Sequence, residues 1–136
     1  MRSSLHHAHL FASNLEESIK FYREMFGAKI VFDLEVAGAR NVMLSIGTSK
    51  INFYDQPAKD QSRGAIHHLG IETDDLEMLV THMKNKGFQF INEIKNIGTL
   101  KYVMVAAPDN ILLELFELAK NLPEDQYNLI STLNSL

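Results

Sequence analysis

The residues of this sequence that could carry chemistry lie near the first and last strands of two similar halves. His7 matches His68 at an offset of 61 residues, and Asn52 matches Glu114 at an offset of 62. If a pseudo-twofold axis relates the two halves, these four side chains point into one shared cavity. Two imidazoles and one carboxylate suit a divalent transition metal that keeps open coordination positions. The spacing therefore predicts a metal site formed by His7, His68 and Glu114.

Strand alternation predicts which neighbouring side chains join this site. Residues two apart on a strand share a face, so His7 and His9 should face the same way. The adjacent His6 and His67 should then face away from the metal.

A purely structural interpretation competes with the metal site at each position. A single histidine in a strand is more often a hydrogen-bonded structural residue than a ligand. Glu114 has a stronger case, because a carboxylate between Leu113 and Leu115 has to be paired, metal-bound or placed at an edge. Arg40, next to a turn, is expected to be a surface charge. The residues that could line the cavity, or simply pack, are His9, Asn52, Tyr54, Tyr102 and Met104.

The first half has the pattern of one βαβββ unit. An apolar run over residues 5–11 predicts a strand, and Asn14 with Glu17 three residues later predicts a helix start. Gly27 is expected to end this helix. Three runs rich in β-branched and aromatic residues then predict strands over 29–36, 41–46 and 50–54.

The second half repeats the pattern after a polar linker. It predicts a strand over 65–73, a helix that begins after Asp75 and stops at Gly87, and strands over 88–94, 100–106 and 111–118. Pro108-Asp109-Asn110 is expected to form the last turn. The modules are thus predicted over 5–55 and 65–118 of a single domain spanning 1–136. A further helix is predicted over 123–134, outside the repeat.

Composition narrows the classes of partner. The chain has 136 residues, 46% hydrophobic and 22% charged, which is ordinary for one globular domain. A net charge of -4 disfavours nucleic acid and acidic membranes as partners. There is no cysteine, so any metal must be held by nitrogen and oxygen. The polar Arg2-Ser3-Ser4 start argues against a signal peptide or membrane span, so the expected location is the cytoplasm.

Three motifs together resemble the vicinal oxygen chelate superfamily, which includes glyoxalase I, methylmalonyl-CoA epimerase, extradiol dioxygenases and bleomycin-resistance proteins. They are the Ser18-Ile-Lys-Phe-Tyr22 helix, the His68-Leu-Gly-Ile strand, and the Pro108-Asp-Asn ending that leads to Leu113-Glu-Leu115. The resemblance covers roughly residues 5–118. It implies an α+β fold in which two βαβββ modules form a cupped, half-barrel mixed sheet with helices outside.

Carried over by position, the resemblance makes His7, His68 and Glu114 the ligands of one divalent ion, of Fe, Mn, Ni, Co or Zn. Asn52 stands where glyoxalase I has glutamate and the epimerase has glutamine. Because a neutral amide is not a general base, Glu114 is the expected catalytic base and Asn52 is expected to lie behind the ligands. The superfamily also implies a homodimer, for which Ile30 to Phe32 and Val103 to Val105 are candidate apolar faces.

The implied activity is that of a lyase, isomerase or dioxygenase of this type, which chelates a small oxygen-bearing substrate on the ion and stabilises its anionic intermediate. Glyoxalase I chemistry is disfavoured, because displacing Glu114 as the base would leave only two imidazoles on the metal. Extradiol dioxygenation and thiol transfer fit three ligands better. Against transfer to fosfomycin, the cationic substrate-binding residues of the superfamily's fosfomycin-resistance transferases have no evident counterpart after Glu114, where Leu115 to Ala119 is mostly apolar. The alternative is a metal-free protein that sequesters a small molecule, like the bleomycin-resistance proteins. Retention of all three ligands favours an enzyme.

Overall fold

The computed structural model describes residues 2–3, 5–36, 38–58 and 66–121 of the chain. These residues fall into two compact units, Met1–Ser62 and Arg63–Leu136, which match the two halves of the sequence repeat. The helix predicted over 123–134 lies outside the described residues.

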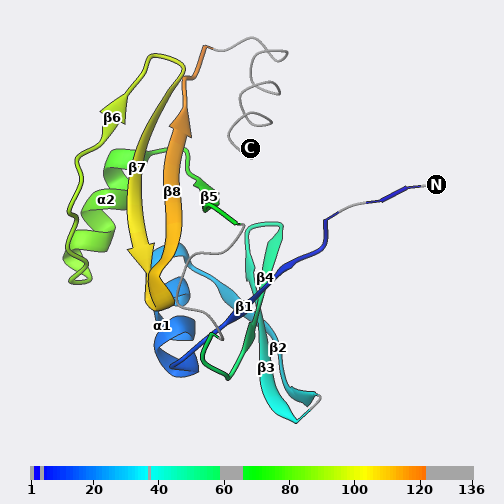
Figure 1. The fold of residues 1–136 in the computed structure, drawn as a ribbon. Helices are drawn as coiled ribbons and strands as arrows, with labels where there is room; N and C mark the ends of the chain where they lie inside the picture. The colour runs from blue at the N-terminus through cyan, green and yellow to red at the C-terminus, as the bar shows by residue number, and fades with distance from the viewer. Residues whose placement is uncertain (1, 4, 37, 59–65, 122–136) are drawn as a thin grey trace. The chain divides into compact units, whose positions relative to one another are not determined.

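Each unit contains the elements of a βαβββ module, as predicted (Figure 1). The elements of unit 1 are β1 (Ala8–Phe11), α1 (Leu15–Phe26), β2 (Lys29–Val36), β3 (Ala39–Ile46) and β4 (Ser49–Tyr54). The elements of unit 2 are β5 (Leu69–Glu72), α2 (Leu76–Asn85), β6 (Lys95–Asn96), β7 (Leu100–Ala107), the 3-10 turn Pro108–Asn110 and β8 (Ile111–Leu118).

The two sheets have the same strand order. Unit 1 forms the sheet β1-β4-β3-β2 and unit 2 forms the sheet β5-β8-β7-β6. In each, the first strand pairs in parallel with the last, while the remaining pairs are antiparallel. The parallel pairs place His9 opposite Asn52 and Gly70 opposite Glu114, which confirms the offsets of 61 and 62. The fold is therefore two four-stranded mixed sheets, each with one helix.

Helix α1 begins and ends as the sequence predicts. The Asn14 side chain accepts a hydrogen bond of 3.1 Å from the backbone N–H of Glu17. Gly27 adopts a left-handed conformation with φ of 66° and closes the helix. Tyr22, fully buried on the inner side of α1, packs its ring 5.3 Å from that of Phe53 on β4. His9 and Asn52 lie on the other face of this sheet, which points away from α1.

Helix α2 depends on a carboxylate from the sheet. Asp75 accepts a hydrogen bond of 2.9 Å from the Met78 N–H. The backbone N–H of Leu76, which has no partner within the helix, donates to Glu117 Oε1 at 2.9 Å. Lys101 on β7 lies 3.7 Å from Glu117 Oε2 and 3.7 Å from Glu77 Oε1. Glu117 thus joins the start of α2 to β8, on the face of β8 opposite Glu114.

The strand predicted over 88–94 is wrong, because the strand that pairs with β7 is only Lys95–Asn96. The Asn92 side-chain amide donates to the Met104 carbonyl at 3.2 Å, so a side chain takes the place of a backbone partner on β7. The rings of Phe88 and Phe90 contact each other edge to face, with centroids 5.0 Å apart. The alternating hydrophobic residues of 88–94 therefore belong to the connection between α2 and β6, where the two phenylalanine rings pack on each other.

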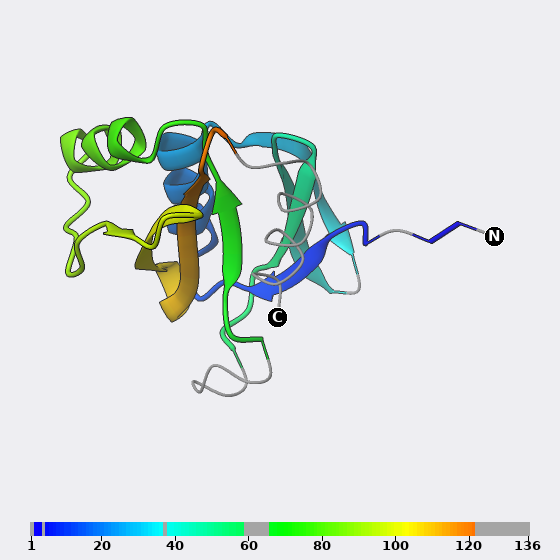
Figure 2. The ribbon, with the colours of Figure 1, turned by 90° about the horizontal axis from the view of Figure 1, so that it is seen from above.

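The first strand of each unit is also shorter than predicted. β1 starts at Ala8 and β5 starts at Leu69, so His7 and His68 each immediately precede a strand. The segment before β1 continues away from sheet β1-β4-β3-β2 in both views (Figures 1 and 2). Strand alternation therefore does not fix the directions of the histidines before residues 8 and 69.

The turn between β7 and β8 sets the register that places Glu114. Asp109 and Asn110 both adopt positive φ, at 63° and 57°. Asp and Asn tolerate this left-handed conformation better than other non-glycine residues. Across this turn Ala107 pairs with Ile111 and Met104 with Glu114, which confirms the predicted turn. Among the described residues, no helix is long and apolar enough to span a bilayer.

We predict that Glu117→Ala lowers the free energy of unfolding by about 2 kcal/mol, because it leaves the Leu76 N–H unpaired and removes a charge-assisted hydrogen bond. Glu77→Ala is the matched control, because Glu77 also faces Lys101 but its side chain is 73% exposed. Urea denaturation of both variants measures the difference. Equal stability of the two variants would contradict the role of Glu117.

Candidate metal and substrate site

Two of the three predicted ligands meet in unit 2. His68 Nε2 lies 3.2 Å from Glu114 Oε2, and both side chains are largely buried, at 16% and 12% exposure. Met104 on β7 and Gly70 on β5 flank Glu114 in the sheet. The first and last strands of this module thus bring an imidazole and a carboxylate together, as the sequence predicts for His68 and Glu114.

The pair requires a positive charge or a proton between its two atoms. A neutral imidazole nitrogen with a free lone pair repels a carboxylate oxygen, so Nε2 must either carry a hydrogen or share a cation with Glu114. Metal bonds of about 2.1 Å at right angles place two ligand atoms about 3.0 Å apart, which is close to the observed separation. The donor set and its spacing therefore fit a divalent ion.

Each candidate ligand histidine contacts the histidine before it in the chain. His6 Nδ1 lies 3.0 Å from His7 Nδ1, and His67 Nδ1 lies 2.9 Å from His68 Nδ1. The prediction that His6 and His67 face away is wrong, because all four residues precede the strands. One nitrogen in each pair must donate and the other accept. A ligand histidine whose Nδ1 is engaged in this way has its Nε2 left for a metal.

Unit 1 presents a different arrangement at the equivalent places. Asn52 is buried at 5% exposure, and its Nδ2 lies 3.0 Å from His9 Nε2 and 3.3 Å from Asn41 Oδ1. Asn41 is also buried, at 4% exposure. Its own Nδ2 donates to the backbone carbonyls of Val36 and Ala39. Asn41 was not among the predicted site residues, although the strand register places it on the same sheet face as Asn52.

His9 is an acceptor in this arrangement. Burial, followed by the proximity of His7, lowers the pKa of His9 below its usual 6.5, and a side-chain hydrogen bond with Asn41 partly opposes this shift. Because the amide nitrogen of Asn52 can only donate, His9 Nε2 is the acceptor in their 3.0 Å contact. The Asn52 Oδ1 atom is buried and has no hydrogen-bond partner in the described residues. An acceptor left in this state costs about 1–3 kcal/mol, so the atom marks a place where a bound group would be stabilised.

The other predicted cavity residues divide between the two units. In unit 1, the ring of His9 stacks on Tyr54 with centroids 4.0 Å apart. In unit 2, Tyr102 packs against the apolar cluster of Leu100, Phe116 and Leu118. Tyr102 thus has a packing role, whereas His9 and Tyr54 form a flat aromatic surface beside Asn52.

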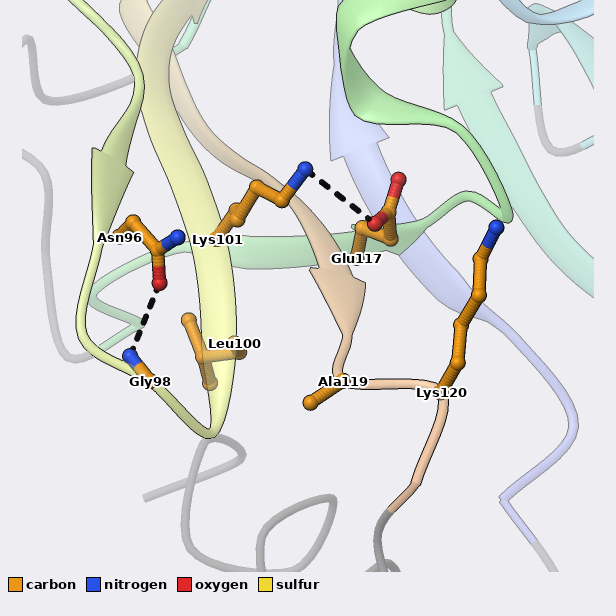
Figure 3. Close-up of a pocket in the computed structure, with 7 residues that line it drawn as sticks. All are labelled: Asn96, Gly98, Leu100, Lys101, Glu117, Ala119 and Lys120. Atoms are coloured by element: carbon orange, nitrogen blue, oxygen red, sulfur yellow. Dashed lines mark hydrogen bonds and ion pairs between the residues drawn. The ribbon is translucent and has the colours of Figure 1, made fainter.

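A cavity of about 340 Å³ in unit 2 lies apart from the predicted residues (Figure 3). It is lined by Asn96, Gly98, Leu100, Lys101, Glu117, Ala119 and Lys120. Figure 3 shows Lys101 directed toward the Glu117 carboxylate, with which it forms an ion pair. None of the predicted metal or substrate residues lines this cavity.

Arg40 is more than an isolated surface charge. Its guanidinium donates to both carboxylate oxygens of Asp33, at 2.9 and 2.8 Å, and to Glu16. These contacts lower the pKa of Asp33 below its usual value and raise that of Arg40. Arg40 thus links the β2–β3 hairpin to α1, which gives it a structural role.

The third predicted ligand, His7, belongs to unit 1. Within the described residues, no group of three His, Asp or Glu side chains is gathered to hold a metal. Unit 2 supplies the His68 and Glu114 pair, and the participation of His7 stays a prediction.

A sequence profile described as the Glyoxalase/Bleomycin resistance protein/Dioxygenase superfamily matches residues 4–115. The chain belongs to this superfamily. The match spans β1 to most of β8, and so includes both parallel strand pairs.

Curated relatives in this superfamily include mitochondrial methylmalonyl-CoA epimerases. The Mus musculus protein is 26% identical over 105 residues, which is 69% of this chain and 59% of the relative. The Dictyostelium discoideum protein is 25% identical over 129 residues, or 83% and 77% of the two chains. The chain thus spans about three-fifths of the length of the mammalian relatives.

Solved structures confirm the superfamily fold. A glyoxylase/bleomycin resistance protein/dioxygenase domain from Frankia sp. EAN1pec matches with a TM-score of 0.74 and 18% identity, covering 88% of this chain and all of that one (100%). A genomically encoded fosfomycin resistance protein from Listeria monocytogenes, complexed with Mn(II) and sulfate, matches with a TM-score of 0.65 and 18% identity. The match covers 88% of this chain and 96% of that chain.

Proposed function

We propose that this protein is a metal-dependent enzyme of the glyoxalase or dioxygenase type, in which His7, His68 and Glu114 hold one divalent ion. The observation that carries the proposal is the largely buried pair of His68 Nε2 and Glu114 Oε2, 3.2 Å apart. His7 joins the set because it stands at the place in unit 1 (module 1) that His68 has in unit 2 (module 2). Fe, Mn, Ni, Co and Zn all accept such nitrogen and oxygen ligands.

The charge of the ligand set supports an anionic substrate. Two neutral imidazoles and one carboxylate leave a divalent ion with a formal charge of about +1. When bound, the ion would act as a Lewis acid toward the substrate oxygens and stabilise negative charge that develops on them. Small molecules with two adjacent oxygen atoms are therefore the expected substrates.

Glu114 is the chain's candidate proton acceptor at this site. Its carboxylate is largely shielded from solvent, and its Oε2 lies 3.2 Å from His68 Nε2. Asn52, at the equivalent place in module 1, is a neutral amide and accepts no proton. The chemistry thus assigns a single carboxylate base, which comes from module 2.

Known relatives support a small-molecule enzyme. The curated relatives are methylmalonyl-CoA epimerases. A mutant of the Listeria monocytogenes fosfomycin resistance protein has been solved with Mn(II) and 1S,2S-dihydroxypropylphosphonic acid. That protein shares only the fold with this chain, yet its ligands are of the kind that the proposed site would bind.

We also propose that the chain forms a homodimer through the edge strand β2. Ile30, Val31, Leu34 and Val36 on this strand are each 45–54% exposed. Val103 and Val105, the other candidate face, are buried at 1% and 5%, so that part of the expectation is wrong.

Light scattering should give twice the 15.4 kDa chain mass, and replacing Val31 or Leu34 by lysine should lower the measured mass. A monomer mass at all concentrations would reject the dimer.

A cytoplasmic location stays a prediction from sequence.

We predict that Glu114→Gln lowers affinity for a divalent ion at least tenfold, because a neutral amide replaces the one charged ligand. Glu117→Gln is the matched control, since it makes the same change on the same strand but on the opposite face, and keeps an acceptor for Leu76. Elemental analysis of protein purified without an affinity tag or chelator measures the metal content.

His68→Ala and His7→Ala should show the same loss as Glu114→Gln, which tests the ligand set across the two modules. If His68→Ala loses the metal while His7→Ala keeps it in full, His7 is not a ligand. Equal metal content in Glu114→Gln and Glu117→Gln would reject the site as a whole.

The enzyme and the sequestering protein differ in how metal affects ligand binding. A bidentate oxygen ligand such as acetohydroxamate should bind the metal-loaded protein at least about a hundredfold more tightly than the metal-free protein. Isothermal titration of both forms, with His68→Ala as control, makes the measurement. Equal binding with and without metal would favour the sequestering protein over the enzyme.

A further inference from the structure

Unit 1 contains a chain of side-chain hydrogen bonds that determines which end of the Asn52 amide is free. The chain begins at Asn41, whose Nδ2 donates to the carbonyls of Val36 at 3.3 Å and Ala39 at 3.1 Å. Because these partners are acceptors only, the nitrogen of Asn41 must face them. Its Oδ1 must then face Asn52 as an acceptor.

Asn52 is oriented in turn by two acceptors. Its Nδ2 has two hydrogens, and two acceptors lie within reach: Asn41 Oδ1 at 3.3 Å and His9 Nε2 at 3.0 Å. Both donors of the amide are thereby used. Its Oδ1 is buried and without a hydrogen-bond partner in the described residues. The amide therefore presents an unpaired oxygen whose orientation is fixed from both sides.

This arrangement is not required by the fold, because module 2 lacks it. The strand registers place Gly70 where module 1 has His9, and Tyr102 where module 1 has Asn41. Gly70 has no side chain, and Tyr102 packs against the apolar cluster of Leu100, Phe116 and Leu118. Glu114, at the place of Asn52, faces His68 instead. The Asn41–Asn52–His9 chain is thus a feature of module 1 alone.

We propose that Asn41 and His9 are positioning residues that hold Asn52 Oδ1 as a fixed acceptor for an electropositive group of a bound species. Because the oxygen is buried, that group must be enclosed by the protein: either the ion itself, or an O–H or N–H of a molecule bound beside it. The inference rests on the proposed function through His7, whose ring centroid lies 6.1 Å from that of His9. Asn52 would then add a contact that the three-ligand site lacks.

The orientation of the amide is tested without metal by nitrogen-15 NMR of the His9 ring. In the wild type, His9 should carry its hydrogen on Nδ1 and have a free lone pair on Nε2. Asn41→Leu releases the Asn52 amide, so the His9 ring should change to a mixture of tautomers. A wild-type ring with its hydrogen on Nε2, or a ring unchanged by Asn41→Leu, would overturn the positioning.

A second variant covers the case in which Asn41→Leu fails to fold. His9→Phe keeps a ring to stack on Tyr54 and removes both ring nitrogens, including the Nε2 acceptor. The two side-chain N–H resonances of Asn52 should then separate less or exchange faster, since one hydrogen bond is lost. Unchanged Asn52 resonances in His9→Phe would show that His9 does not hold the amide.

The partner of the oxygen is tested with Mn(II) alone and then with acetohydroxamate on the Mn(II)-loaded protein. If Asn52 contacts the ion, Asn52→Leu and Asn41→Leu should lower Mn(II) affinity about tenfold. If it accepts from a bound molecule, Mn(II) affinity should hold and acetohydroxamate affinity should fall about tenfold. Asn85→Ala, an exposed amide at the end of α2, is the control. Unchanged affinity for both probes would overturn the proposal.

Failure of the proposed function gives a different result. A wild type that binds no Mn(II) would reject the metal site and the electropositive partner together. The NMR result on His9 and Asn52 would still decide, by itself, whether Asn41 and His9 position the amide.

Discussion

The parallel pairing of the first and last strands in each module is the constraint on which the candidate chemistry depends. β1 lies beside β4 and β5 beside β8, although dozens of residues separate the paired strands in sequence. Each pairing brings a residue at the start of a module next to one near its end. His68 meets Glu114 in this way, and His9 meets Asn52. A slip of one residue along β4 or β8 would turn Asn52 or Glu114 to the opposite face of its sheet.

The two modules use the same backbone for different chemistry. Module 2 places a carboxylate next to an imidazole, a pair that holds a cation or a proton. Module 1 places the Asn52 amide next to the His9 imidazole. The side-chain nitrogens of Asn41 and Asn52 both donate to acceptors of the same module. The duplicated fold thus provides one half with a carboxylate and one half with a neutral amide at the equivalent place.

Much of the fold could be predicted from the sequence, because each half of the repeat gave an independent indication of the same βαβββ order. The cap at Asn14, the glycine after α1 and the offsets between the halves were each sufficient to place an element. The strand predicted over 88–94 failed because Asn92 replaces a backbone ladder partner, which a hydrophobic pattern does not reveal. The contacts of His6 and His67 were missed because alternation was applied beyond the ends of the strands. Asn41 was missed because its importance lies in the orientation of another amide, which residue type and spacing do not encode.

Glu114 and Glu117 occupy opposite faces of one strand that is paired on both sides. β8 lies between β5 and β7, so its backbone amides can exchange with solvent only when neighbouring strands separate. On one face this strand carries the carboxylate that we assign to the ion, and on the other the carboxylate that caps α2. Opening of β8 would disrupt both at once. Any species that binds at Glu114 should therefore slow local opening at the first turn of α2 as well, although the helix lies on the far side of the sheet.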